Sequence, residues 1–150
     1  MIAIVRIRGN AKVNVNVERT LELLGLKTVN NCVVVPKDVT HIGMIAKTRE
    51  LITYGEITRD VYVQMLLKWG KTMGGEKVTE EYLKKKGFDL DKFTKEIFEG
   101  ETTLRKQGIK STFRLHPPRK GYEGIKLQYN KGGALGDRGA EINELLKRMI

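Results

Sequence analysis

Three segments in the first sixty residues carry the hydrophobic pattern of strands. Over residues 3–8, apolar side chains at every second position predict a strand with one apolar face, whose other face turns basic toward its end. Residues 29–35, which are followed by Pro36, are mostly apolar and β-branched, so a central strand is predicted there. A shorter strand is expected over residues 53–57.

Helical spacing fills the two intervals between these strands. Asn14 or Asn16 can cap a first helix, which Gly25 ends and whose apolar face holds Val17, Leu21 and Leu24. Thr40 is a plausible cap for a second helix that carries Ile42, Ile45 and Ala46 inward. The order β-α-β-α-β predicts a small split α/β sandwich in which the helices cover one face of a sheet.

The remainder of the chain changes to a mainly helical pattern. Helices are predicted over residues 61–69 after Asp60, 82–86 after Thr79, and 93–98 after Asp91. Residues 112–115 and 125–129 have the pattern of short strands or extended arms, and residues 142–149 that of an amphipathic helix. Because no internal repeat or long linker separates the parts, we expect residues 59–150 to pack as an extension on a core of residues 1–58.

Composition narrows the class of protein. A chain of 150 residues suits one domain with an appended part, and it can bury a hydrophobic core. The single cysteine, Cys32, excludes an intramolecular disulfide framework and a cysteine zinc cluster, and its apolar neighbours predict a buried thiol. No run approaches the roughly 20 apolar residues that cross a bilayer. We therefore expect a protein of a reducing compartment with no membrane partner.

The net charge of +10 points to a polyanionic partner, and its distribution is uneven. Residues 1–50 carry a net charge of +4, residues 51–100 are neutral, and residues 101–150 carry +6. Between Arg105 and Lys131, eight basic side chains face the single carboxylate of Glu123. This clustering beside glycines and prolines is typical of a patch that binds phosphates, although a solvated basic face without a partner is the simpler alternative.

No arrangement of residues predicts catalysis or a metal site. The two histidines, His41 and His116, have no converging set of ligands nearby, so they are interpreted as polar surface residues or donors to phosphate. The acidic pairs at positions 80–81 and 89/91 fall at predicted helix starts, where capping explains them. Neither a cofactor nor a small-molecule substrate is expected.

Two basic segments are candidates for contact with an RNA backbone. Pro117 and Pro118 stiffen an arm over residues 116–121, and Tyr122 or Tyr129 could stack on bases, although core packing explains tyrosines as well. Residues 131–139 resemble a glycine-rich loop that holds phosphate at the start of a helix. This segment lacks the order of a nucleotide-binding P-loop, so an RNA backbone fits it better, and a flexible hinge is the alternative.

Several sequence motifs occur together in an order that resembles a known family. They are Arg-Ile-Arg-Gly at 6–9, Thr-Leu-x-x-Leu at 20–24, Asn-Asn-Cys-Val-Val-Val-Pro at 30–36, His-Ile-Gly-Met-Ile-Ala-Lys at 41–47 and Ile-Thr-Tyr-Gly-Glu-Ile at 52–57. The chain thereby resembles the "L thirty" family of large-subunit ribosomal proteins in its archaeal form. Segments 113–121 and 135–139 extend the resemblance to nearly the whole chain.

The resemblance implies a ferredoxin-like core with a mainly helical C-terminal extension, which carries a basic β arm and a terminal helix. It also implies a non-enzymatic, structural constituent of the large ribosomal subunit in the cytoplasm. Such a protein binds large-subunit rRNA near the 5S rRNA, and its partners include the 5S rRNA and neighbouring ribosomal proteins. A free RNA-binding regulator and an RNA-acting enzyme stay open as alternatives. The expected RNA contacts are Arg6, Arg8, Lys12, His41, Gly43, Lys47, Arg114, His116, Arg119, Lys120, Lys126, Lys131, Gly132, Gly133 and Arg138.

Overall fold

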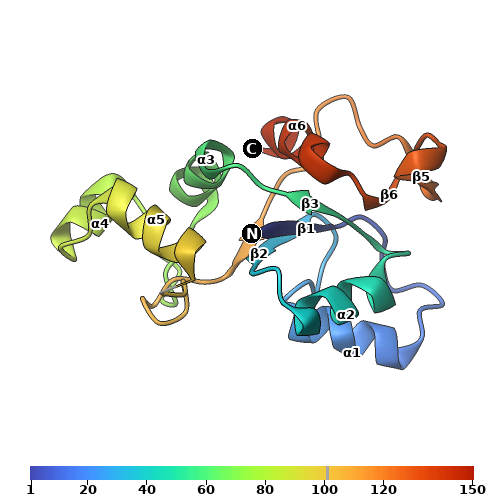
Figure 1. Ribbon diagram of the computed structural model, residues 1–150, viewed down its shortest axis with the longest axis horizontal. Helices are drawn as coiled ribbons and strands as arrows, with labels where there is room; N and C mark the ends of the chain where they lie inside the picture. Colours follow the sequence, from blue (N-terminus) through green and yellow to red (C-terminus); the bar gives the residue numbers. More distant parts are fainter. Residues whose placement is uncertain (101) are drawn as a thin grey trace.

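The computed structural model describes residues 1–100 and 102–150, and Figure 1 shows how their helices and strands are arranged. The first part consists of β1 (Ile2–Arg6), α1 (Val15–Leu23), β2 (Asn31–Val35), α2 (Val39–Thr48) and β3 (Ile52–Glu56). Next come α3 (Arg59–Trp69), α4 (Glu80–Lys85) and α5 (Leu90–Glu99). The chain ends with β4 (Thr112–Arg114), β5 (Gly124–Gln128), β6 (Gly133–Asp137) and α6 (Ile142–Met149).

All six of these strands belong to one sheet, in the order β4-β2-β1-β3-β6-β5. The central strand, β1, is antiparallel to β2 and β3, whereas β6 is parallel to β3. The C-terminal part therefore supplies one strand to one edge of the sheet and two strands to the other. The predicted β-α-β-α-β order and the mixed α/β class with a ferredoxin-like core are confirmed.

Helices cover both faces of the central sheet, as Figure 1 shows. On one face, Ile4 of β1 packs with buried residues of α1 and α2, including Leu21 and Ile45. On the other face, Val5 packs with Phe113 and with buried residues of α3, α5 and α6. All five residues of β1 are buried, so the prediction that this strand has a basic outer face is wrong. A strand covered by helices on both sides needs apolar residues on both.

The first two helices differ in how well the sequence pattern describes them. Of the two predicted caps, Asn14 is the one that caps α1, with its Oδ1 accepting a hydrogen bond from the Asn16 amide at 2.9 Å. In contrast, α2 begins after Asp38, two residues before the expected cap. Its inward face runs through Ile45 and Thr48, and Ile42 is 46% exposed. The inward positions predicted for Ile42 and Ala46 are therefore wrong, because these residues lie on the outer side of the helix.

The glycine-rich segment also has a different structure from the predicted phosphate loop. Gly133–Asp137 forms β6 between β3 and β5, and a short 3₁₀ turn, Gly139–Glu141, precedes α6. A Cβ atom at Gly133 would lie 2.1 Å from the carbonyl oxygen of Leu127. Glycine is required there because β5 and β6 approach closely, and not because a phosphate does. No helix among the described residues is long and apolar enough to cross a membrane.

Candidate nucleic-acid interface

A cleft of about 580 Å³ opens beside β4, at one edge of the sheet. We call it the β4 cleft. Three separate stretches of chain contribute to it: residues 22–31, residues 69–75 and residues 105–114. Its cationic side chains are Lys27, Lys71, Arg105, Lys110 and Arg114.

Backbone pairing fixes the relative positions of these cations. The Lys110 amide donates to the Lys71 carbonyl oxygen at 2.8 Å, next to an antiparallel bridge between Thr72 and Ile109. On the opposite side, Arg114 of β4 is the register partner of Asn31 of β2. The Thr112 hydroxyl donates to the Gly25 carbonyl oxygen at 3.2 Å, which holds β4 against the segment that carries Lys27. The cleft is thus formed by the fold and not by one flexible loop.

The electrostatics of the β4 cleft favour anions. Among residues 1–100 and 102–150, no carboxylate lies within 4.0 Å of any of its five cationic groups. Glu22 is the only carboxylate among the described residues that line it. Elsewhere, Lys37 and Arg59 have carboxylate partners, Glu56 at 2.9 Å and Asp91 at 3.0 Å. A concave surface with several unpaired like charges concentrates the opposite charge, and phosphates match its sign.

Three further predicted contacts lie next to the cleft or on the arm that leaves it. His116 follows β4 and contacts the Trp69 ring edge to face, with ring centroids 4.8 Å apart. Arg119 and Lys120 lie exposed on a turn closed by a hydrogen bond from the Gly121 amide to the Pro118 carbonyl oxygen. The Arg119 amide donates to the Arg148 carbonyl oxygen at 3.0 Å, so the arm is held against the end of α6.

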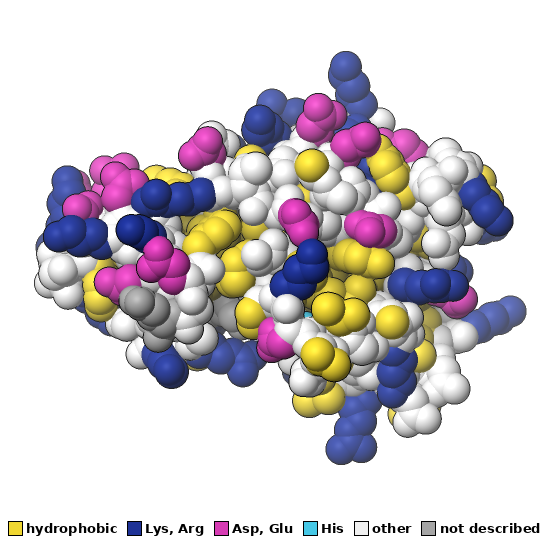
Figure 2. All heavy atoms as spheres, in the orientation of Figure 1, with side chains coloured by type: hydrophobic (Ala, Val, Ile, Leu, Met, Phe, Trp, Pro, Cys, Tyr) yellow, Lys and Arg dark blue, Asp and Glu magenta, His cyan; other side chains and the backbone are white. Residues whose placement is uncertain are grey.

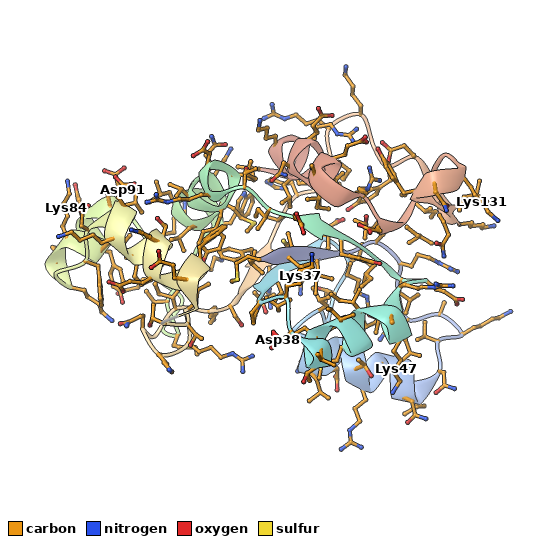
Figure 3. All side chains as sticks on the ribbon, in the orientation of Figure 1. Lys37, Asp38, Lys47, Lys84, Asp91 and Lys131 are labelled. Atoms are coloured by element: carbon orange, nitrogen blue, oxygen red, sulfur yellow. The ribbon has the colours of Figure 1, made fainter. Side chains whose placement is uncertain are left out.

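Other predicted contacts lie on separate surfaces. Arg8 and Lys12 belong to the loop between β1 and α1, where Lys12 is exposed. Lys126 and Lys131 lie exposed on and after β5, next to Gly132, and Figure 3 shows Lys131 far from Lys47 of α2.

Two predicted contacts on α2 have surroundings that differ from the expected ones. Gly43 lies inside α2, whose first residue is Val39, and not at a helix start that could face phosphate. His41 is half-buried, with Nδ1 2.8 Å from Asp38 Oδ2.

Arg6, predicted as a direct RNA contact, lies inside the protein with a relative exposure of 1%. Its Nη1 donates to the carbonyl oxygens of Leu26 and Lys27 at 2.8 and 2.9 Å. Its Nε donates to the Arg8 carbonyl oxygen at 2.9 Å, and its Nη2 donates to the Asn10 side chain. Burial lowers the pKa of Arg6, against the opposing effect of the Glu18 charge. Four of its five N–H groups therefore join two loops, and the side chain is enclosed by the protein.

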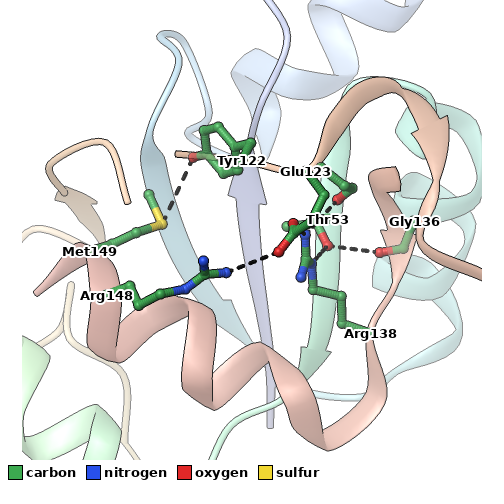
Figure 4. Close-up of polar contacts among 8 residues, drawn as sticks. Thr53, Tyr122, Glu123, Gly136, Arg138, Arg148 and Met149 are labelled. Carbon is green, nitrogen blue, oxygen red and sulfur yellow. Dashed lines mark hydrogen bonds and ion pairs between the residues drawn. The ribbon is translucent and has the colours of Figure 1, made fainter. Parts of the chain in front are cut away.

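Arg138, the last predicted contact, is also buried, and Figure 4 shows its polar contacts. Its Nη2 lies 2.7 Å from Glu123 Oε2, and its Nε donates to the Thr53 hydroxyl at 3.1 Å. Arg148 of α6 contacts the other oxygen of Glu123 at 3.2 Å. Partial burial acts to raise the pKa of Glu123, but the hydrogen bonds and charges of Arg138 and Arg148 outweigh it and lower the pKa to about 2. This carboxylate fastens the C-terminal end of the arm to β3 and α6.

The Glu123 contact leads to a prediction about pH. Its pKa is lower in the folded protein than in the unfolded chain, so its stabilisation is present above about pH 4.5 and is lost as the pH falls toward 2. Glu123→Gln should lower the Tm by about 2–4 °C at pH 7, and the difference should shrink between pH 4.5 and 2. Thermal unfolding across this range measures the effect, with Glu141→Gln as the control. An equal difference at every pH would contradict the assignment.

Two further kinds of chemistry, metal binding and nucleophilic attack by a thiol, can be assessed from the described residues. No group of three or more His, Cys, Asp or Glu in residues 1–100 and 102–150 is arranged to hold a metal ion. Cys32 is fully buried, as predicted, and burial raises the pKa of its thiol to about 12 despite a hydrogen bond to the Ile4 backbone. A thiol in this state is not a nucleophile at neutral pH.

The sequence reasoning missed four of the five cations in the β4 cleft as site residues. Arg105 and Lys110 lie in the strongly basic stretch between Arg105 and Lys131, so the clustering of charge in the sequence could have identified them as site residues. Lys27 and Lys71 had no such signal, since Lys71 belongs to the neutral third of the chain. They join the others only through long-range backbone pairing.

A small α/β domain whose cationic side chains gather on one concave surface is typical of proteins that bind nucleic acids. Comparisons with known proteins specify the family. The family described as Ribosomal protein L30p/L7e matches residues 2–52. The chain is 42% identical to the large ribosomal subunit protein uL30 of Methanococcus maripaludis, over 99% of this chain and 98% of that protein. It is 43% identical to the protein of the same name from Nanoarchaeum equitans, over 100% and 99% of the two chains. The chain therefore belongs to the uL30 family of large-subunit ribosomal proteins, which confirms the resemblance.

Proposed function

We propose that this protein is a structural constituent of the large ribosomal subunit and binds large-subunit rRNA chiefly through the β4 cleft. The observation that carries the proposal is the convergence of five cationic side chains without a carboxylate partner among the described residues. Membership in a family of large-subunit ribosomal proteins supports RNA as the polyanion. No step of this role requires a nucleophile, a metal ion or a cofactor.

The protein binds RNA by placing charges at fixed positions. Lysine and arginine side chains displace counterions from phosphates, and this release supplies most of the affinity. The fold determines where those phosphates lie, because backbone hydrogen bonds join the walls of the cleft. β4 pairs with β2, and the Lys110 amide donates to the Lys71 carbonyl oxygen. The exposed turn with Arg119 and Lys120 and the loops with Lys12 and Lys131 provide further contacts around the same molecule. Arg6 and Arg138 support these loops from inside.

A finer proposal concerns the location in the subunit. The motif resemblance favours a position near the 5S rRNA, with other ribosomal proteins as neighbours. The part of the surface over α4 and α5, on the left of Figure 2, carries both signs of charge interspersed. Because such a surface neither attracts nor repels a polyanion strongly, it suits a protein neighbour. Hydroxyl-radical footprinting of 5S rRNA in subunits with and without the protein tests this placement; an unchanged footprint would argue against it.

Co-sedimentation with large subunits in a sucrose gradient tests the main proposal. The protein should migrate with the subunit, and the double variant Lys71→Glu/Lys110→Glu should remain mostly at the top. A matched control, Lys84→Glu/Lys85→Glu, changes the same charge on α4, whose residues do not line the cleft. This control should co-sediment like the unaltered protein. If the unaltered protein stays at the top, the proposal is wrong; if both variants behave alike, the cleft is not the main contact.

A further inference from the structure

The β4 cleft contains a buried amide group that the protein itself leaves partly unpartnered. Asn31, the first residue of β2, has a relative exposure of 5% and lines the cleft. Its Oδ1 accepts a hydrogen bond from the Thr28 hydroxyl at 3.0 Å. Its Nδ2 donates to no acceptor among residues 1–100 and 102–150, and the protein does not fully enclose this atom. Because Asn31 lines the cleft and this N–H group has no acceptor among the described residues, the donor is available to a ligand there.

The groups around Asn31 match the separate parts of a nucleotide. Arg114 lies directly across from Asn31 in the β2–β4 register, and Lys27 lies on the preceding loop. These cations suit a phosphate. Trp69 lines the same cleft and presents an aromatic ring next to His116. RNA-binding proteins hold unstacked bases on aromatic or guanidinium planes and read their edges with amide donors.

The size of the cleft distinguishes a single nucleotide from a helix. Its volume of about 580 Å³ lies within the range of roughly 300–1,000 Å³ that is common for small-ligand pockets. A double helix is too wide to enter such a pocket, whereas one base and its ribose phosphate fit. A surface that contacts only helix phosphates has no need for a buried amide donor or an indole ring.

From these observations we propose that the β4 cleft binds one unpaired nucleotide of RNA, with its phosphate on Lys27 and Arg114 and its base against Trp69 and Asn31 Nδ2. The inference rests on the proposed rRNA-binding function and specifies what the cleft takes from that RNA. Asn31 Nδ2, as a donor, pairs with an acceptor on the edge of the base, such as O4 of uracil or O2 of cytosine.

Nuclear magnetic resonance titrations with two probes, uridine 5′-monophosphate and ribose 5-phosphate, test this site. Both probes carry the same phosphate, and only the first carries a base. The nucleotide should bind at least about fivefold more tightly, since stacking and one hydrogen bond contribute about 1 kcal/mol or more. It should also shift the Asn31 side-chain amide and the Trp69 indole signals, which ribose 5-phosphate should leave unchanged. Equal affinities for the two probes would overturn the nucleotide site.

The variant Asn31→Asp isolates the amide donor. Aspartate retains an acceptor for the Thr28 hydroxyl and removes the N–H group. The added negative charge weakens both probes by a similar factor, so the ratio of their affinities reports the contact with the base. This ratio should fall in Asn31→Asp but stay above one, because stacking of the base on Trp69 remains. It should stay unchanged in Asn30→Asp, which adds the same charge one residue away, where Asn30 Oδ1 accepts from Tyr122. An unchanged ratio in Asn31→Asp would overturn the role of Asn31.

The same protein preparations should be assayed for binding to large-subunit rRNA. Retained rRNA binding together with equal affinities for the two probes would show that the nucleotide site is wrong while the proposed function stands. Loss of rRNA binding by the unaltered protein would overturn both.

Discussion

Replacement of Arg6 by methionine should lower the free energy of unfolding by about 3 kcal/mol, which is a large share of the stability of a domain of this size. The guanidinium group of Arg6 is 1% exposed and donates to three backbone carbonyl oxygens and to Asn10. Methionine has a similar length but no donors. The Leu26 carbonyl oxygen then loses its partner in the interior, whereas the oxygens of Arg8 and Lys27 are only partly buried, so water replaces part of their bonds. Each buried acceptor without a partner costs about 1–3 kcal/mol, and local relaxation recovers part of the sum. Urea denaturation followed by circular dichroism measures the change.

The control for this prediction is Arg8→Met, which removes the next arginine along the chain. Arg8 is partly exposed and makes one long contact, 3.4 Å, to the Glu50 carbonyl oxygen. Its replacement should change stability by less than about 0.5 kcal/mol, as is usual for surface residues. Near-equal effects of the two substitutions would contradict the structural role of Arg6. A second variant, Arg6→Lys, should be intermediate, because lysine keeps the charge but cannot span the separated carbonyl groups.

Arg6 also shows why part of the candidate site could not be predicted from the sequence. Alternation identified the strand correctly, and an arginine near the end of a strand is usually exposed. Its burial depends on the loops at residues 8–14 and 24–30, whose carbonyl oxygens point at its side chain. A local pattern holds no information about carbonyl groups some twenty residues away in the sequence. Arg138, which Glu123 and Thr53 hold, is a second example of the same effect.

The elements themselves were easier to predict than the site. Apolar periodicity and caps identified the core strands and α1, because these signals are local and strong. The sequence pattern did not predict that residues 133–137 form a strand, because Gly-Ala-Leu-Gly-Asp has almost no side chains that favour strands. It forms a strand because β3 and β5 lie on either side of it and because glycine permits their close approach. The β4 cleft has the same origin, in contacts between segments far apart in the chain.

Affinity for large-subunit rRNA should fall about 10³-fold when salt rises from 50 to 200 mM, if the five cations of the β4 cleft and one from the arm each make one contact with a phosphate. Counterion release makes log K fall linearly with log salt, with a slope of roughly −0.9 per phosphate contact, so six contacts give a slope of about −5.4. Lys71→Gln/Lys110→Gln removes two of these contacts and should reduce the slope to about −3.6. The control Lys84→Gln/Lys85→Gln, on α4, should keep the slope of the unaltered protein. Filter binding at several salt concentrations measures all three slopes. A slope near zero for the unaltered protein would contradict the electrostatic account. If the control variant had the same reduced slope as the cleft variant, the phosphate contacts would be spread over the whole surface.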